Sequence, residues 1–176
     1  MEVKSTNRED FKLIYEQNYE LLMSVVIHIV YNQDIAQDLT QETFERFFLK
    51  NMTFPSELDA RYWLIRVAKN LALNSVRRNK REIQMVEKVK KDTDLHLYKE
   101  GEEHLIEEEE RMEVRRAIES LPDNLKLVIK LKEYSDLDYK AIGKVLGISE
   151  TNVKVRVYRA RKKLEEMLVK EDSDVY

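Results

Sequence analysis

Residues 138–164 read DYKAIGKVLGISETNVKVRVYRARKKL, and this stretch decides the fold of the C-terminal part of the chain. It divides into a short amphipathic segment that ends at Leu146, a turn around Gly147, and a longer basic helix from Glu150. Glycine can adopt the left-handed conformation that ends a helix, and the hydroxyl of Ser149 can cap the next one. Two helices joined by so short a turn cross steeply, so the stretch predicts a helix-turn-helix.

The second helix of this motif combines one apolar stripe with a basic remainder. The stripe recurs at helical spacing and consists of Val153, Val157, Ala160 and Leu164. The other faces carry Tyr158 and the basic residues Lys154, Arg156, Arg159, Arg161, Lys162 and Lys163. Such a helix suits the major groove of DNA. The alternative is a solvated basic helix in an ordinary bundle, but the tight turn and the density of Arg and Lys favour DNA binding.

Composition predicts an all-α protein. The chain has 176 residues with only 3 Gly and 2 Pro, and its long segments follow the helical period rather than the alternation of a strand. Besides the helix-turn-helix, the pattern indicates helices at about residues 7–31, 32–50, 56–79, 108–120 and 124–134.

The charge pattern divides the chain into two small helical domains, 1–80 and 111–176, joined by an acidic linker, 81–110. The net charge of −3 conceals this segregation, because Arg66 to Arg81 carries only basic charges whereas acidic residues gather at Glu100 to Glu110. Such asymmetry fits local contact with DNA. A flexible linker of this kind leaves the two domains without a preset relative geometry.

Several classes of protein are disfavoured by composition. Without cysteine, the chain can form neither disulfides, a thiol nucleophile nor cysteine-based zinc sites, and His28, His96 and His104 lack ligand spacing. We therefore expect no metal or other cofactor and no catalytic residues. No segment is apolar enough to span a bilayer, and no signal peptide is evident, so we expect a cytoplasmic protein without membrane insertion.

The second predicted helix carries an acidic outward face. Asp38, Gln41, Glu42 and Glu45 lie three and four residues apart and share it. This face is either solvated or a docking surface for a basic partner. The inward set is predicted to be Ile35, Leu39, Thr43, Phe47 and Phe48.

The third predicted helix carries a polar stripe formed by Arg66, Asn70, Asn74, Arg77 and Arg78. It lies opposite the apolar side, which consists of Leu64, Ala68, Leu71, Ala72 and Ser75. Asparagine can both donate to and accept from a base edge, and arginine suits phosphate or guanine. Tyr62 and Trp63 could stack on unpaired bases, although a tryptophan at this position is more typical of a core.

Three runs in this order resemble the extracytoplasmic-function sigma factors of bacterial RNA polymerase. They are DIAQDLTQETFERFF (34–48), RYWLIRVAKNLALNSVRR (61–78) and LPDNLKLVIKLKEYSDLDYKAIGKVLGISETNVKVRVYRARKKL (121–164). The third run alone resembles other helix-turn-helix regulators too, whereas the three together are specific to the family.

The resemblance implies a role for each face. Asp38, Gln41 and Glu42 match positions that dock on the clamp of core polymerase. The stripe of Arg66, Asn70, Asn74, Arg77 and Arg78 matches the helix that engages the melted minus-ten element. The positions that read the duplex minus-thirty-five element are matched by Lys154, Val155, Arg156, Tyr158 and Arg159. The linker would thread the RNA exit path.

Three departures from the family pattern bear on promoter sequence. Val155 stands where a small hydroxyl residue is usual, Gly143 replaces the usual alanine, and Lys140 with Ala141 replaces an acidic pair.

The sequence thus predicts an alternative sigma factor whose partners are core RNA polymerase, promoter DNA and an anti-sigma factor. A stand-alone helix-turn-helix regulator would explain the C-terminal domain but would leave the Asp38 and Asn70 faces without purpose. An enzyme is disfavoured, because the chain has no cysteine, dispersed histidines and no glycine-rich loop.

Overall fold

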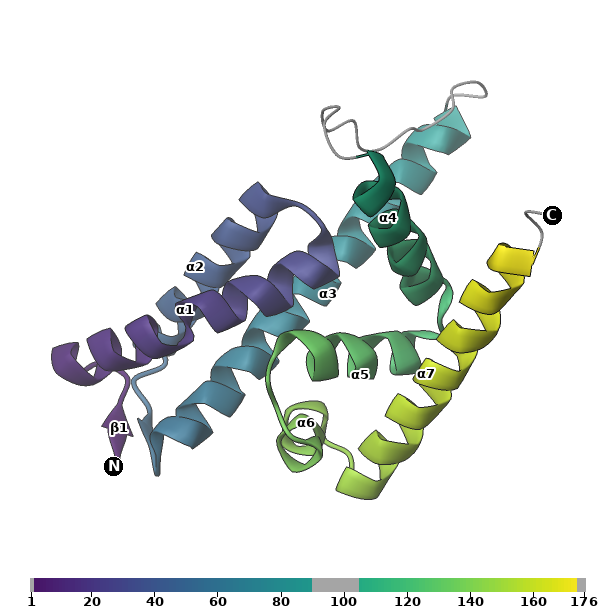
Figure 1. The fold of residues 1–176 in the computed structure, drawn as a ribbon. Helices are drawn as coiled ribbons and strands as arrows, with labels where there is room; N and C mark the ends of the chain where they lie inside the picture. Colours follow the sequence, from purple (N-terminus) through teal and green to yellow (C-terminus); the bar gives the residue numbers. More distant parts are fainter. Residues whose placement is uncertain (1, 90–104, 174–176) are drawn as a thin grey trace.

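Helices make up nearly all of the regular structure, so the all-α prediction is confirmed. The computed structural model describes residues 2–89 and 105–173, which form seven helices and a pair of two-residue strands (Figure 1). The N-terminal domain contains β1 (Val3–Lys4), α1 (Arg8–Val30), α2 (Gln33–Leu49), β2 (Thr53–Phe54) and α3 (Glu57–Val89). The C-terminal domain contains α4 (Leu105–Ser120), α5 (Asp123–Tyr134), α6 (Tyr139–Leu146) and α7 (Glu150–Ser173).

The first three helices pack around one core, and α1 contacts both α2 and α3. Fully buried Leu22, Phe47 and Leu64 bring one side chain from each helix into this core. The antiparallel pairing of Val3 with Phe54 ties the N-terminus to the segment between α2 and α3. The sequence pattern did not indicate these strands, because two residues are too few to show alternation.

The inward face of α2 matches the predicted one at Thr43 and Phe47, which are fully buried, and differs from it elsewhere. Phe44 is buried, whereas Phe48 is 45% exposed and lies edge-on to the ring of Phe11. Ala36 and Thr40 are also buried on α2, at 0% exposure. The buried face is therefore rotated towards small residues, which allow close helix packing but contribute little to an apolar pattern.

The helix α3 is longer than predicted, because it continues past residue 79 to Val89. Half of the predicted linker, residues 90–104, lies outside the described residues, and α4 begins at Leu105.

The helix-turn-helix forms through the predicted local signals. Asp138 caps α6 by accepting a hydrogen bond from the backbone N–H of Ala141 at 2.6 Å. Gly147 ends this helix with a left-handed φ of 71°. Ser149 then accepts from the backbone N–H of Asn152 at 3.2 Å at the start of α7. Each residue satisfies backbone groups that helix termini leave unpaired.

Gly143 lies where the turn passes closest to α6. A Cβ atom at this position would lie 2.7 Å from the carbonyl oxygen of Ile148, which is closer than Cβ atoms come to other atoms in folded proteins. The backbone N–H of Ile148 donates to the Gly143 carbonyl at 3.0 Å and holds the turn in place. The close approach explains why glycine stands at this departure from the family pattern.

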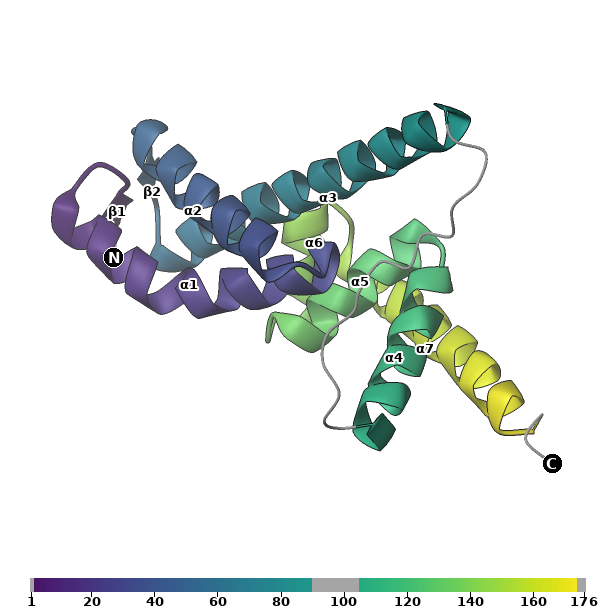
Figure 2. The same ribbon diagram turned by 90° about the horizontal axis from the view of Figure 1, so that it is seen from above.

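The two domains pack against each other. Helix α1 contacts α5, and α3 contacts α6, so the C-terminal domain lies against the first and third helices (Figure 2). The expectation that the linker leaves the domains without a preset geometry is therefore wrong for this structure, because side chains rather than the linker fix their arrangement. In the described part of the chain, no helix is both long and apolar enough to cross a membrane.

Candidate nucleic-acid and polymerase interfaces

The outward face of α7 is open and basic. Val153, Val157 and Ala160 are buried against the rest of the C-terminal domain, as their spacing predicted. Of the residues predicted to read duplex DNA, Arg156 is half-buried and the others are exposed, namely Lys154, Val155, Tyr158 and Arg159. Exposed side chains on a helix with a buried opposite side can enter a DNA groove without disturbing the fold.

Two cations of α7 have acidic partners. Lys154 pairs with Glu150 one turn earlier, with Nζ 2.7 Å from Oε1. The hydrogen bond to Glu150 raises the pKa of Lys154, so this lysine is fully charged. Arg161 donates to Glu133 of α5 at 3.0 Å, which directs its guanidinium towards the domain rather than outward. Arg161 is thereby distinguished from Arg159, although their sequence spacing alone does not separate them.

The polar stripe of α3 is exposed along its whole length. Arg66, Asn70, Asn74, Arg77 and Arg78 are all exposed. On the opposite side, Leu64, Ala68 and Ala72 are fully buried. Five consecutive stripe positions of Arg and Asn therefore form one polar surface that could follow a nucleic-acid strand.

The aromatic residues at the start of α3 have different surroundings. Trp63 packs in the core against Phe47 and Phe54, with ring centroids 5.8 and 6.0 Å away. This position agrees with the core interpretation of Trp63. Tyr62 is half-buried, and the Lys144 ammonium of α6 lies 5.2 Å from its ring centroid.

The acidic face of α2 contains Asp38 and Gln41, both exposed, and Glu42, which is half-buried. Gln41 donates to Glu45 at 3.1 Å. Arg46 donates to Glu42 at 2.6 Å. These bonds join neighbouring turns of one helix and hold the side chains on its surface, so the face is structurally ordered and available for a partner.

Comparison with known proteins identifies the class to which these faces belong. The model of "Sigma-70 region 2" matches residues 14–82, which contain the faces of α2 and α3. The model of "Sigma-70, region 4" matches residues 111–164, which contain the helix-turn-helix. The two matches define a sigma-70-type transcription initiation factor.

Relatives narrow the class. The chain is 34% identical over 146 residues to the ECF RNA polymerase sigma factor SigE of Mycolicibacterium smegmatis, which covers 81% of this chain and 55% of that protein. It is 26% identical over 174 residues to SigW of Bacillus subtilis, covering 95% of this chain and 93% of that one. The chain belongs to the extracytoplasmic-function (ECF) sigma factors of bacterial RNA polymerase. Such factors are not enzymes; they bind core polymerase and promoter DNA and direct transcription initiation.

Two solved structures share the fold. One is a co-crystal of the sigma factor RpoE with the anti-sigma factor NepR from Bartonella quintana, with a TM-score of 0.66 and 24% identity over 91% of this chain and 97% of that one. The other is CnrH in complex with the cytosolic domain of CnrY, with a TM-score of 0.64 and 20% identity over 93% of this chain and 90% of that one.

Proposed function

We propose that this alternative sigma factor docks on core polymerase through α2, engages the melted minus-ten element through α3 and reads the duplex minus-thirty-five element through α7. One observation carries this proposal. Three exposed polar faces of different chemistry occur on one chain, each on a helix whose opposite side is buried. A stand-alone regulator would need only the face on α7.

The α7 face suits duplex DNA because it combines two kinds of contact. Lys154, Arg156 and Arg159 supply charge for phosphates and donors for guanine. Val155 is 39% exposed and offers an apolar surface to a thymine methyl group. Tyr158 is 68% exposed and can contact sugar or phosphate through its hydroxyl.

The α3 stripe suits unpaired bases. Asn70 and Asn74 lie one turn apart and are exposed, so both can donate to and accept from the edges of bases that have left the duplex. Arg66, Arg77 and Arg78 lie towards the ends of the stripe and supply positive charge for phosphates.

The α2 face suits a basic protein surface. Asp38, Gln41 and Glu42 present carboxylates and an amide at the spacing of one helix face. Charge complementarity with a basic helix would guide docking and fix its register.

An anti-sigma factor is a further proposed partner. One solved structure of the same fold contains a sigma factor bound to an anti-sigma factor, and the other contains CnrH bound to the cytosolic domain of CnrY. We infer that this chain is also held by such a protein and acts in the cytoplasm, where polymerase transcribes.

Reconstitution with core polymerase tests the proposal. The triple variant Asp38→Ala, Gln41→Ala, Glu42→Ala should lose affinity for core enzyme and run-off transcription, because removal of charges from a docked interface costs about 2–5 kcal/mol. A matched control replaces the exposed Glu9, Glu16 and Glu20 of α1 with alanine and should retain both activities. Wild-type affinity in the Asp38 variant would assign the α2 face to solvent. Tight, sequence-specific promoter binding without polymerase would instead favour the stand-alone regulator.

A further inference from the structure

The inference starts at Tyr31, the residue that follows α1. Its backbone has a left-handed φ of 53° and ψ of 32°, and its N–H donates to the Ile27 carbonyl at 2.7 Å. A bulky residue in this conformation is strained, and such strain persists only where the surroundings hold the residue in place. Glycine would fit this backbone conformation better, so the contacts of the tyrosine side chain must offset the strain.

The ring of Tyr31 reaches into the other domain. The guanidinium carbon of Arg115 on α4 lies 3.6 Å from the ring centroid, and the Lys130 ammonium on α5 lies 4.5 Å from it. The hydroxyl lies near the carboxylate of Glu119 at the end of α4. Burial, followed by the carboxylate of Glu119, raises the pKa of Tyr31. One side chain of the N-terminal domain thus contacts three charged groups of the C-terminal domain.

These charged groups form one network, so exposing only one of them is costly. Lys130 is 6% exposed and donates to Glu119 at 2.6 Å, while Lys126 donates to the other carboxylate oxygen at 3.2 Å. Burial lowers the pKa of Lys130. At Glu119 burial favours the neutral acid, but the hydrogen bonds and charges of the two lysines outweigh it and lower the pKa. The Tyr31 ring covers this network on the side that faces the N-terminal domain.

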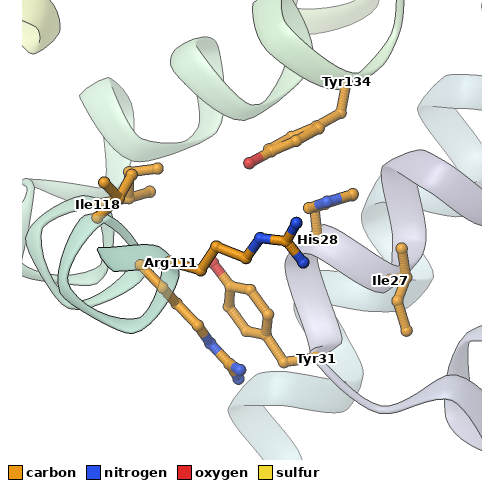
Figure 3. Close-up of a pocket in the computed structure, with 8 residues that line it drawn as sticks. Ile27, His28, Tyr31, Arg111, Ile118 and Tyr134 are labelled. Atoms are coloured by element: carbon orange, nitrogen blue, oxygen red, sulfur yellow. The ribbon is translucent and has the colours of Figure 1, made fainter. Parts of the chain in front are cut away.

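A second pair of aromatic side chains reinforces the contact. The ring of His28 on α1 stacks on that of Tyr134 on α5, with centroids 3.4 Å apart. Figure 3 shows His28, Tyr31 and Tyr134 around a pocket between the domains. The junction is therefore built from shape-specific aromatic and charged contacts rather than from a loose apolar patch.

The same packing engages the polar stripe of α3. The guanidinium of Arg66 donates to the Lys144 carbonyl at 2.6 Å. This carbonyl lies in the last turn of α6, where helix carbonyls lack partners within the helix and attract cations. Further along α3, Arg77 lines a groove together with Asp123 and Asn124 of α5. Both ends of the stripe thus border the C-terminal domain.

We propose that Tyr31 is a latch that holds the C-terminal domain against the N-terminal domain in the free protein. The closed arrangement also pairs Arg66 of α3 with the Lys144 carbonyl of α6, while the polar stripe itself stays exposed. Core polymerase would release the latch by binding the two domains separately. This release rests on the proposed function, whereas the latch itself does not.

Two variants of Tyr31 test the latch without disturbing the fold of either domain. Tyr31→Gly removes the ring and also relieves the left-handed backbone, so the turn after α1 should form at least as readily. Tyr31→Phe removes only the hydroxyl that lies near Glu119. Asn51→Gly is the matched control, because Asn51 also has a left-handed φ of 48° but lies in the N-terminal domain between α2 and β2.

Energy transfer between two dyes measures closure. The chain contains no cysteine, so Lys12→Cys on α1 and Glu166→Cys on α7 give one exposed labelling site in each domain. The wild type should give a single high-transfer state. Tyr31→Gly should raise the open-to-closed ratio by about fivefold or more, Tyr31→Phe by less, and Asn51→Gly should leave it unchanged. An unchanged ratio in Tyr31→Gly, with normal circular dichroism, would overturn the latch.

Run-off transcription with core polymerase is measured in parallel with energy transfer. Failure of the wild type to direct transcription would contradict the proposed function, and it would leave the test of the latch intact.

Discussion

The DNA faces of α3 and α7 carry similar side chains but have different neighbours. On α7, the reading residues face outward while Arg161, their neighbour, is bound to Glu133 of the same domain. On α3, Arg66 donates across the junction to Lys144. The chemistry of a basic helix therefore does not reveal whether its face is free. The inward contact of α7 lies within its own domain, whereas one end of the α3 stripe is hydrogen-bonded to the other domain.

The junction between these faces gives the largest predicted effect. Glu119→Ala leaves Lys130 buried without its carboxylate, and it also removes the carboxylate that lies near the Tyr31 hydroxyl. Breaking a buried ion pair costs about 3–5 kcal/mol, and we expect about 2–4 kcal/mol because Glu119 itself is 42% exposed. Urea unfolding of the whole chain measures the loss.

The control for this variant is Glu133→Ala, which breaks the ion pair with Arg161. The side chain of Arg161 is 57% exposed and that of Glu133 is 48% exposed. Such exposed pairs contribute less than about 1 kcal/mol. Equal losses in the two variants would mean that the buried network is no stronger than a surface pair.

The next prediction addresses the α7 face. Arg159→Ala should weaken recognition of the duplex element by about 1–3 kcal/mol, because a bidentate base contact is lost. Arg161→Ala, two residues away, should leave recognition nearly unchanged, because Arg161 is turned towards Glu133. The measurement is holoenzyme binding to promoter fragments selected from a random library with the wild type. Equal effects of the two substitutions would remove the distinction between the outward and inward arginines.

A smaller effect is expected on the α3 face. The double variant Asn70→Ala, Asn74→Ala should weaken binding of holoenzyme to a forked promoter with an unpaired minus-ten strand by about 1–2 kcal/mol. Binding to a fragment that carries only the upstream duplex element should not change. Arg159→Ala should show the opposite pattern on the same two probes. A loss on both probes in the asparagine variant would show that the two faces do not act on separate elements.

Sequence reasoning succeeded where a feature depends on interactions between residues that are close in the sequence. Gly147 and Ser149 were predicted correctly because capping depends only on adjacent backbone groups. The exposed stripe of α3 also followed from helical periodicity. The buried face of α2 was predicted only in part, because Ala36 and Thr40 are buried by close helix packing and carry little apolar signal.

Sequence patterns do not predict the role of Tyr31. In sequence it is one aromatic residue at the end of a helix, and its partners Arg115, Glu119 and Lys130 lie in another domain. The bond from Arg66 to Lys144 likewise joins residues 78 positions apart. Such contacts depend on how two finished domains dock, and no local spacing encodes that. A tyrosine at a helix end is a weak signal of a left-handed position, because many helices end in the ordinary way.

The smallest effect concerns pH, and it tests the junction without removing a contact. His28 donates from Nδ1 to the Ser24 carbonyl at 2.6 Å, and its ring stacks on Tyr134. Burial lowers the pKa of His28 from its ordinary 6.5; the bond to Ser24 opposes this change and the positive charge of Lys130 adds to it. The closed state thus favours the neutral imidazole.

The sign follows from this direction. When the domains open, His28 becomes exposed and regains its ordinary pKa, so the open state binds the proton more readily. Closure is at full strength above the ordinary pKa of 6.5, weakens as the pH falls through that value, and levels off below the lowered pKa. Arg111 and Arg115, which line the same pocket, stay charged throughout and add to the repulsion of a protonated His28. Glu119 has a lowered pKa and does not titrate in this window.

Energy transfer in the doubly labelled protein, from about pH 7.5 to about pH 5.5, measures this dependence. The open fraction should rise modestly on acidification. His28→Phe retains an aromatic ring that can stack on Tyr134 but cannot take up a proton, so its open fraction should stay flat over the same range. A flat wild-type profile would mean that His28 has the same proton affinity in both states. Equal slopes in the wild type and His28→Phe would assign the dependence to another group. In either case closure would not respond to pH through His28, and the latch would depend on Tyr31 and its charged partners.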